Sequence, residues 1–177
     1  LEERWDPAAT ITVSARAARE SGTRLGLRAG EQLAARDALR AMLIASANDA
    51  CLALAEHAAG SEAAFVERMN RRAADLGLGA TRFDNPCGHD GAAQHTSARD
   101  LVRLTRAALE RPEFRLTVGA VRVRLSTRGG RVFDLPSHNP LVGRVDGVRG
   151  VKTGYTPGAG KCLVVLAERS GREVVVV

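Results

Sequence analysis

The spacing of the apolar residues changes near residue 112, and the change limits the folds that the chain can adopt. After a short alternating stretch near the start, the apolar positions from about residue 34 to residue 112 recur at helical intervals, as Phe65, Met69, Ala73 and Leu76 do. Beyond Phe114 the period is two, and short apolar segments alternate with turns. Helices followed by strands, with no linker or repeat between them, predict an α+β fold with antiparallel strands rather than a parallel doubly wound sheet.

Capping and turn residues set the expected limits of these elements. Ser61 precedes a helix that Gly77 ends, and Ser97 with Asp100 forms a capping-box-like start to another. The expected helices are at 34–44, 50–59, 61–76 and from 97 to about 112. A short strand or extended piece opens 8–18, and further strands are expected in a 121–133 hairpin, at 148–155, 162–167 and 174–177. The glycine-rich stretch 77–94 is predicted to be a long loop, and loops of that length are usually functional.

The length of 177 residues fits one domain with a real core, since a domain of about 150 residues buries about two thirds of its unfolded surface. The final apolar run, Val174–Val177, has no terminating signal, and Leu1–Glu3 resembles the tail of a helix. We therefore expect a single partial domain over residues 1–177, truncated at both ends.

Composition argues against several classes of function. The net charge of +6 would suit an anionic partner, but all but two of the 26 basic residues are arginines spread along the whole length. Aromatic residues make up only 3% of the chain, so it lacks the stacking platforms of single-stranded nucleic acid sites. No stretch approaches the ~18 apolar residues that a membrane-spanning helix needs. We expect neither nucleic acid binding nor a membrane span in this chain.

The cysteines and histidines show no metal or redox pattern. Cys51, Cys87 and Cys162 are odd in number and lack Cys-x-x-Cys spacing, so we expect neither a zinc site nor a disulfide framework and interpret them as small buried hydrophobes. The histidines lack the spacing of a triad or a metal site, and we interpret all four as structural or surface residues: His57, His89, His95 and His138. No cofactor or metal is expected.

Two tripeptides carry the polar groups of an acyl-transfer site. Lys152-Thr153-Gly154 and Ser46-Ala47-Asn48 match two of the three motifs of active-serine acyl transfer. By chance the first would occur about 0.01 times in a chain of this composition and the second about 0.2 times. A second Ser-x-Asn, Ser137-His138-Asn139, lies in a proline-flanked loop. Ser46 instead lies between two helices expected to be buried, where a polar turn is unexpected unless it has a function. We therefore prefer Ser46.

The third motif, Ser-x-x-Lys, is absent. The lysines are Lys152 and Lys161, and the residues three positions before them are Arg149 and Gly158. The nucleophile is therefore not in this chain.

Longer runs around both tripeptides resemble the serine-type D-alanyl-D-alanine carboxypeptidases of peptidase family S11, the low-molecular-weight penicillin-binding proteins, over essentially the whole chain. The matching runs are 43–50 with 54–57, 65–70, 81–86, 96–101 and 146–163. Ala47 stands where the family usually has glycine, and Cys87-Gly88-His89 replaces a more typical Gly-Leu sequence. The resemblance implies a β-lactamase/penicillin-binding transpeptidase-like fold, an antiparallel sheet packed with a helical cluster. It also implies a Ser-x-x-Lys helix a little upstream of Leu1.

The resemblance further implies a serine-type carboxypeptidase that trims the terminal D-alanine of peptidoglycan stem peptides through an acyl-enzyme. This chain alone, without the nucleophile, is expected to be inactive. The implied ligands are a stem peptide ending in D-Ala-D-Ala and β-lactam inhibitors, and the implied location is extracytoplasmic, in the periplasm or on the outer face of the cytoplasmic membrane. No signal peptide is visible, and membrane anchoring would need segments outside this chain.

On the Ser-x-Asn side, each residue suits a role that the resemblance implies. The Ser46 hydroxyl both donates and accepts, so it can relay a proton between the lysine of Ser-x-x-Lys and the departing D-alanine nitrogen. The bland alternative is a cap on the following helix. The Asn48 amide suits holding the substrate backbone, and its alternative is a turn-stabilising side chain.

On the Lys-Thr-Gly side, the ammonium of Lys152 would face Ser46 and the substrate carboxylate. Thr153 can donate its hydroxyl to that carboxylate, and Gly154, without a Cβ, lets a substrate backbone pair with the strand. By resemblance, the backbone N–H of Tyr155 is one oxyanion donor.

Two other functions stay open. A class A β-lactamase would need a glutamate followed four residues later by asparagine, and no glutamate here meets that condition. A non-catalytic peptidoglycan-binding module would keep the fold without the nucleophile, and the sequence upstream of Leu1 would decide between that module and an enzyme.

Overall fold

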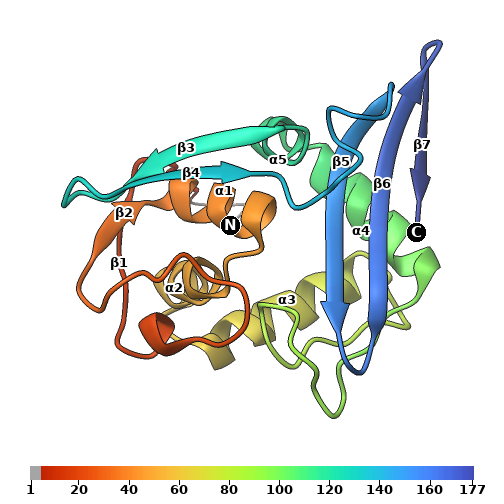
Figure 1. Cartoon of the computed structure of the whole chain (residues 1–177). Helices are drawn as coiled ribbons and strands as arrows, with labels where there is room; N and C mark the ends of the chain where they lie inside the picture. Colours follow the sequence, from red (N-terminus) through yellow and green to blue (C-terminus); the bar gives the residue numbers. More distant parts are fainter. Residues whose placement is uncertain (1–4) are drawn as a thin grey trace. The chain divides into compact units, whose positions relative to one another are not determined.

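The computed structural model describes residues 5–177, which form two compact units (Figure 1). The first unit combines Leu1–Phe65 with Arg122–Pro136, and the second combines Val66–Val121 with Ser137–Val177. The helix-tail interpretation of Leu1–Glu3 lies outside the described residues. The chain passes from one unit to the other three times, so neither unit is a continuous stretch of sequence. The single partial domain expected over residues 1–177 stays a prediction.

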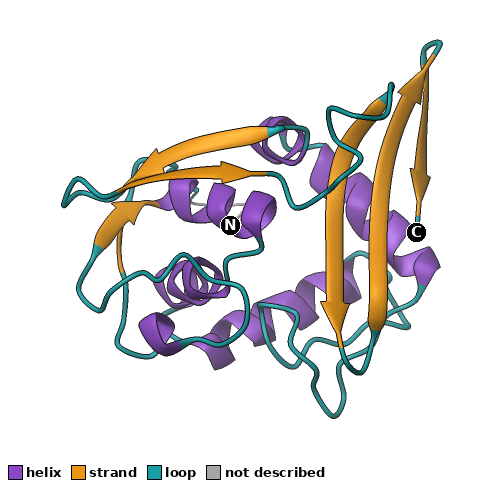
Figure 2. Cartoon of the chain, in the orientation of Figure 1, coloured by secondary structure: helices purple, strands orange, loops and turns teal. Residues whose placement is uncertain are grey.

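The first unit joins two pairs of antiparallel strands to two alanine-rich helices (Figure 2). Its elements are β1 (Thr10–Thr12), the 3-10 helix η1 (Ala17–Arg19), β2 (Gln32–Ala34), α1 (Ala35–Ala45), α2 (Asn48–Ala59), β3 (Arg122–Ser126) and β4 (Val132–Pro136). Ile11 lies opposite Leu33 in the β1–β2 pair, and Val123 lies opposite Leu135 in the β3–β4 hairpin. Helix α1 contacts α2 and both strands of the hairpin, so it is the central helix of this unit.

The large apolar side chains of the first unit are almost fully buried. Ile11, Leu33, Ile44 and Leu52 are each 2% exposed or less. Helix α2 is buried at every position from 49 to 55, a run in which three of the residues are alanines. Small side chains let neighbouring backbones approach closely, so α2 can be enclosed on several sides. The polar turn before α2 is therefore attached to the best-packed helix of the unit.

The second unit is built on a three-stranded antiparallel sheet in the order β5-β6-β7. Its elements are most of α3 (Glu62–Asp75), α4 (Ala98–Leu109), α5 (Pro112–Val118), β5 (Val148–Thr156), β6 (Gly160–Arg169) and β7 (Arg172–Val176). Thr153 of β5 lies opposite Leu163 of β6, and Leu166 of β6 lies opposite Val175 of β7. Helix α5 contacts β5 and α4 contacts β7. β5 is an outer strand of this sheet, with β6 on one side and no further strand among residues 5–177 on the other.

The predicted α+β class with antiparallel sheets is confirmed, and most elements fall within a few residues of their expected places. Three elements were not predicted: the 3-10 helix η1, where an extended piece and a loop were expected, the strand β2 and the helix α5. The 3-residue strand β2 is too short to show a period, although its central Leu33 is fully buried. Helix α5 begins at Pro112, where the sequence suggested only the end of the preceding helix. Proline is well tolerated in the first helical turn, where its missing N–H needs no partner, so the same residue marks a stop and a start.

Of the three cysteines interpreted as small buried hydrophobes, Cys51 is buried, at 4% exposed. Cys162 is instead a free and exposed thiol, and Cys51 and Cys87 are disulfide-bonded, so the expectation of no disulfide is wrong. Spacing in a sequence carries little information about which thiols are oxidised, since that depends on geometry that the spacing does not encode.

Within residues 5–177, no helix is both long and apolar enough to cross a membrane.

Candidate active site

The two predicted halves of the site belong to different units, so each is described by itself. Ser46 and Asn48 lie in the first unit, and Lys152, Thr153, Gly154 and Tyr155 lie in the second. The structure thus brings together the members of each half.

Ser46 ends helix α1 rather than starting α2. Its backbone is in the left-handed region, with φ 52° and ψ 37°, and its N–H donates to the carbonyl of Ala41. The N-cap of α2 is Ala47, without a side-chain cap, so the cap interpretation of Ser46 is wrong. A left-handed conformation costs a non-glycine residue about 1–2 kcal/mol, and such costs cluster at functional sites. Ser46 is half-buried, and it lies in a tight turn between two packed helices.

Asn48 is the first residue of α2 and holds a neighbouring loop. Its Nδ2 donates to the carbonyl of Ser21 at 2.8 Å, and its backbone N–H donates to the carbonyl of Thr23 at 2.8 Å. The turn-stabilising role considered for this residue is therefore present in the structure.

Asp49, which the sequence analysis did not single out, fixes the same loop more firmly. It is fully buried, and its carboxylate accepts the N–H groups of Leu25 at 3.1 Å, Leu27 at 2.9 Å and Ala50 at 2.9 Å. Buried carboxylates need several donors to offset their desolvation. A carboxylate directly before the apolar run 50–55 was the available signal for this anchor. Asp49 and Asn48 together tie residues 21–27 to the Ser-x-Asn turn.

Lys152 lies on β5 with its ammonium partly buried. Its Nζ donates to the carbonyl of Thr153 at 2.8 Å. Burial lowers the pKa of Lys152 below its ordinary value, because the protein solvates the charge less well than water does. The pKa of His138 is also lowered, first by burial and then by the charge of Lys152. The ammonium of Lys152 is thus partly desolvated on the Lys-Thr-Gly strand.

Gly154 is not required by the packing of the sheet. Its φ is not in the left-handed region, and a Cβ added there would meet the Cβ of Cys162, on the paired strand, at an ordinary 3.7 Å. Neither conformation nor crowding in this unit explains a glycine at this position. Next to it, the Tyr155 side chain is 71% exposed. Because Gly154 has no side chain, another backbone could approach the strand closely at this position.

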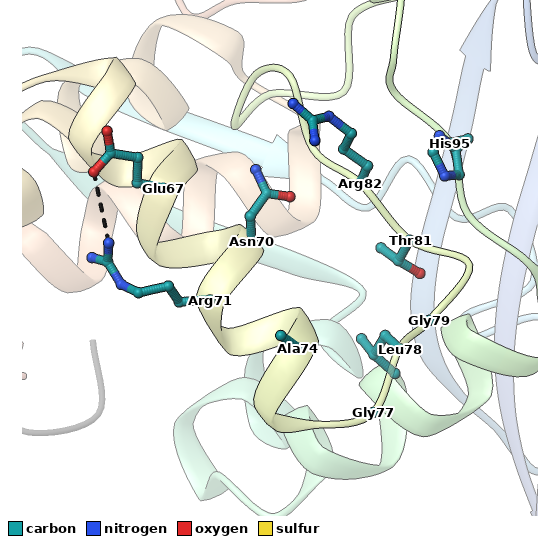
Figure 3. Close-up of a pocket in the computed structure, with 10 residues that line it drawn as sticks. All are labelled: Glu67, Asn70, Arg71, Ala74, Gly77, Leu78, Gly79, Thr81, Arg82 and His95. Carbon is teal, nitrogen blue, oxygen red and sulfur yellow. Dashed lines mark ion pairs between the residues drawn. The ribbon is translucent and has the colours of Figure 1, made fainter.

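A separate groove lies in the second unit (Figure 3). It is formed by one side of α3 and the segment 77–82, with His95 beside them. Its polar groups are largely engaged within the protein: Asn70 exchanges two hydrogen bonds with the backbone of Phe83, and Arg71 lies 3.6 Å from Glu67. None of the residues predicted for the acyl-transfer site lines this groove, so we assign it no part in that chemistry.

The motifs on these two halves match one family throughout. The family model of the D-alanyl-D-alanine carboxypeptidases, peptidase family S11, matches residues 2–177. The chain belongs to this family.

Curated members of the family are similar over most of the chain. D-alanyl-D-alanine carboxypeptidase DacF of Bacillus subtilis is 34% identical over 94% of this chain and 43% of its own length. DacD of Escherichia coli is 36% identical over 85% of this chain and 38% of its own length. The chain therefore spans less than half the length of these two relatives.

Solved structures of the family share the fold. The S216A mutant of the Streptomyces K15 DD-transpeptidase matches with a TM-score of 0.92 and 26% identity, over 98% of this chain and 73% of the other. A D-alanyl-D-alanine carboxypeptidase from Mycobacterium tuberculosis matches with a TM-score of 0.91 and 31% identity, over 98% and 66%. The predicted penicillin-binding fold is thereby confirmed. The roles of the individual site residues stay predictions.

Proposed function

We propose that the full-length protein is a serine-type D-alanyl-D-alanine carboxypeptidase, which removes the terminal D-alanine of peptidoglycan stem peptides. The observation that carries this proposal is the Lys-Thr-Gly tripeptide on the outer strand β5, with a partly buried ammonium and a glycine that packing does not require. Membership of the S11 family supports it. The serine nucleophile and its lysine come from a Ser-x-x-Lys motif that this chain does not contain.

In this proposal, the end of the stem peptide lies along β5 as an added strand. An outer strand offers unpaired backbone groups to an extended peptide, which is a common mode of peptide binding. Gly154 permits close approach of the two backbones. Thr153 donates its hydroxyl to the terminal carboxylate, and the charge of Lys152 attracts that carboxylate. The backbone N–H of Tyr155 stabilises the oxyanion that forms on the carbonyl under attack.

The covalent step requires one bond to form and one to break. The serine oxygen of the missing motif attacks the carbonyl carbon of the penultimate D-alanine, and the C–N bond to the terminal D-alanine breaks. The serine proton passes through the lysine of that motif and the hydroxyl of Ser46 to the leaving nitrogen. Asn48 holds the substrate backbone by its amide. Water then hydrolyses the ester and restores the serine.

Labelling with a fluorescent penicillin, together with release of D-alanine from a peptide ending in D-Ala-D-Ala, tests this function. We expect the full-length protein to form a stable labelled band and to release D-alanine, and the 177-residue chain alone to do neither. A labelled band from the chain alone would refute the assignment of the nucleophile to an outside motif. Rapid turnover of the penicillin without D-alanine release would instead favour the β-lactamase alternative. A full-length protein that is inactive in both assays would favour the binding module.

The proposed substrate implies an extracytoplasmic location, in the periplasm or on the outer face of the cytoplasmic membrane, where peptidoglycan is accessible. Membrane anchoring, where present, would come from segments outside this chain. Labelling of intact cells by a membrane-impermeant penicillin would support this location. Labelling that appears only after lysis would contradict it.

A further inference from the structure

A carboxylate outside the predicted site holds the turn that follows the Lys-Thr-Gly strand. Asp90, from the long loop of the second unit, accepts a hydrogen bond from the Thr156 hydroxyl on Oδ1. Its Oδ2 accepts the backbone N–H of Gly158 at 3.1 Å. The Thr156 hydroxyl also accepts the N–H of Ala159, at 3.0 Å. One carboxylate thus organises two successive N–H groups of the β5–β6 turn, one directly and one through a hydroxyl.

The turn is shaped for this contact. A Cβ added to Gly158 would lie 2.8 Å from Oδ1 and 3.0 Å from Cγ of Asp90. The first distance is shorter than a Cβ tolerates and the second is very tight, so any larger residue at 158 would push the carboxylate away from the turn. Pro157 precedes Gly158 and restricts the backbone on that side. The contact therefore depends on the glycine as well as on the acid.

The loop that presents the carboxylate is held by its own side chains. Asn85 accepts the three backbone N–H groups of residues 87–89 on Oδ1, at 2.8–3.2 Å. Gln94 accepts the N–H groups of Asp84 and Asn85 on Oε1, at 3.1 and 3.3 Å. A Cβ on Gly91 would lie 2.8 Å from the Asp84 carboxylate, so this part of the loop is also closely packed. A loop with this much internal bonding loses little freedom when it presents Asp90 to the turn.

We propose that Asp90 is a positioning residue for the acyl-transfer site, which acts by fixing the end of β5 through Thr156 and Gly158. Thr156 is the residue after Tyr155, whose backbone N–H is an oxyanion donor in the proposed function on which this inference rests. An oxyanion donor contributes only when it lies about 2.7–3.1 Å from the developing charge. A fixed turn keeps the peptide groups of residues 155–158 in one orientation. Asp90 touches no reacting atom in this account.

Three variants test the contact. Asp90→Ala removes both acceptors. Thr156→Val removes the hydroxyl, whereas Thr156→Ser keeps it and should restore wild-type behaviour. Asp75→Asn, an exposed acid at the end of α3 in the same unit, is the matched control.

Amide hydrogen exchange in the full-length protein tests the contact without any reaction. The Asp90→Ala variant should exchange the N–H of residue 158 about tenfold faster or more, and the Thr156→Val variant should do the same for the N–H of residue 159, because in each case that amide loses its acceptor. The Thr156→Ser and Asp75→Asn variants should match the wild type. Because the carboxylate is exposed, Tm should change little in all of them. Unchanged exchange in Asp90→Ala would overturn the proposal.

Penicillin acylation tests the effect on the site. Asp90→Ala should lower the acylation rate constant per titratable site about tenfold while the number of sites stays at the wild-type value, since misaligned donors slow the reaction without removing it. A merely structural role would reduce the number of sites and leave the rate per site unchanged, and that result would overturn the positioning role. A wild-type protein that is never acylated would refute the proposed function itself, and the exchange result would then still decide whether the contact exists.

Discussion

Replacing Ser46 separates the energy of its backbone conformation from the chemistry of its hydroxyl. Its φ of 52° and ψ of 37° place it in the left-handed region, which costs an L-residue about 1–2 kcal/mol and glycine almost nothing. Glycine also has more freedom in the unfolded chain, which offsets about 0.4–1 kcal/mol of that gain. The difference predicts that Ser46→Gly is more stable than Ser46→Ala by about 0.5–1 kcal/mol.

The two variants are matched, because both lack the hydroxyl and differ only in the Cβ. Urea unfolding of the full-length protein, followed by circular dichroism, measures the difference, and in a domain of this size 1 kcal/mol shifts Tm by about 2–4 °C. Both variants should lose acylation rate by about 10²-fold or more, since a proton relay contributes about that much. An alanine variant as stable as the glycine variant would refute the argument from backbone strain. Acylation near the wild-type rate in both would refute the relay.

Three further predictions concern the anchor and the Lys-Thr-Gly strand. Asp49→Ala leaves the loop N–H groups at 25 and 27 without their acceptor, so the free energy of unfolding should fall by about 3–5 kcal/mol in urea, and a loss below about 1 kcal/mol would contradict the anchor. Burial lowers the pKa of Lys152 below its ordinary value of 10.5, so keeping the side chain charged at pH 7 lowers the free energy of unfolding. This loss disappears as the pH rises from the pKa in the folded protein towards 10.5, the pKa in the unfolded chain. Lys152→Met should therefore raise Tm relative to the wild type at pH 7 and less so at pH 10, and an advantage that grows with pH would show that the sign is wrong. Gly154→Val should slow acylation about tenfold or more, because a side chain would hinder close approach of the substrate backbone. The free energy of unfolding should change by less than about 1 kcal/mol, because the added Cβ makes only an ordinary contact. Strong destabilisation would show that the fold needs this glycine.

The regular elements were predictable because their residues repeat a local pattern. Helix α3 follows from four apolar residues at helical spacing and a serine before it, and β5, β6 and β7 follow from alternation broken by glycine turns. The Lys-Thr-Gly and Ser-x-Asn tripeptides were recognisable because their chemistry needs those side chains in that order. Local pattern also explains the errors, since β2 is shorter than any detectable period and Pro112 gives the same signal at the end of one helix and the start of another.

Features that depend on distant parts of the chain were not predictable from pattern. The left-handed conformation of Ser46 is unusual for a residue other than glycine, so nothing in the triplet indicates it. The loop that Asp49 anchors lies 22 to 24 residues earlier, and the turn that Asp90 holds lies 66 to 68 residues later. The division into two units, each made of separated segments, is likewise a property of the folded chain.

The central claim is that Lys152 belongs to the substrate-binding side of an acyl-transfer site, and the second lysine of the chain supplies its control. The measurement is kcat/KM for D-alanine release from a peptide ending in D-Ala-D-Ala, in the full-length protein and in its Lys152→Met and Lys161→Met variants. Lys161 is exposed on the neighbouring strand β6 and has no part in the proposed chemistry. The account predicts a loss of about 10²-fold or more for Lys152→Met, as for other removed electrostatic contacts to a reacting substrate, and a change within about twofold for Lys161→Met. Equal activity of the two variants would contradict it.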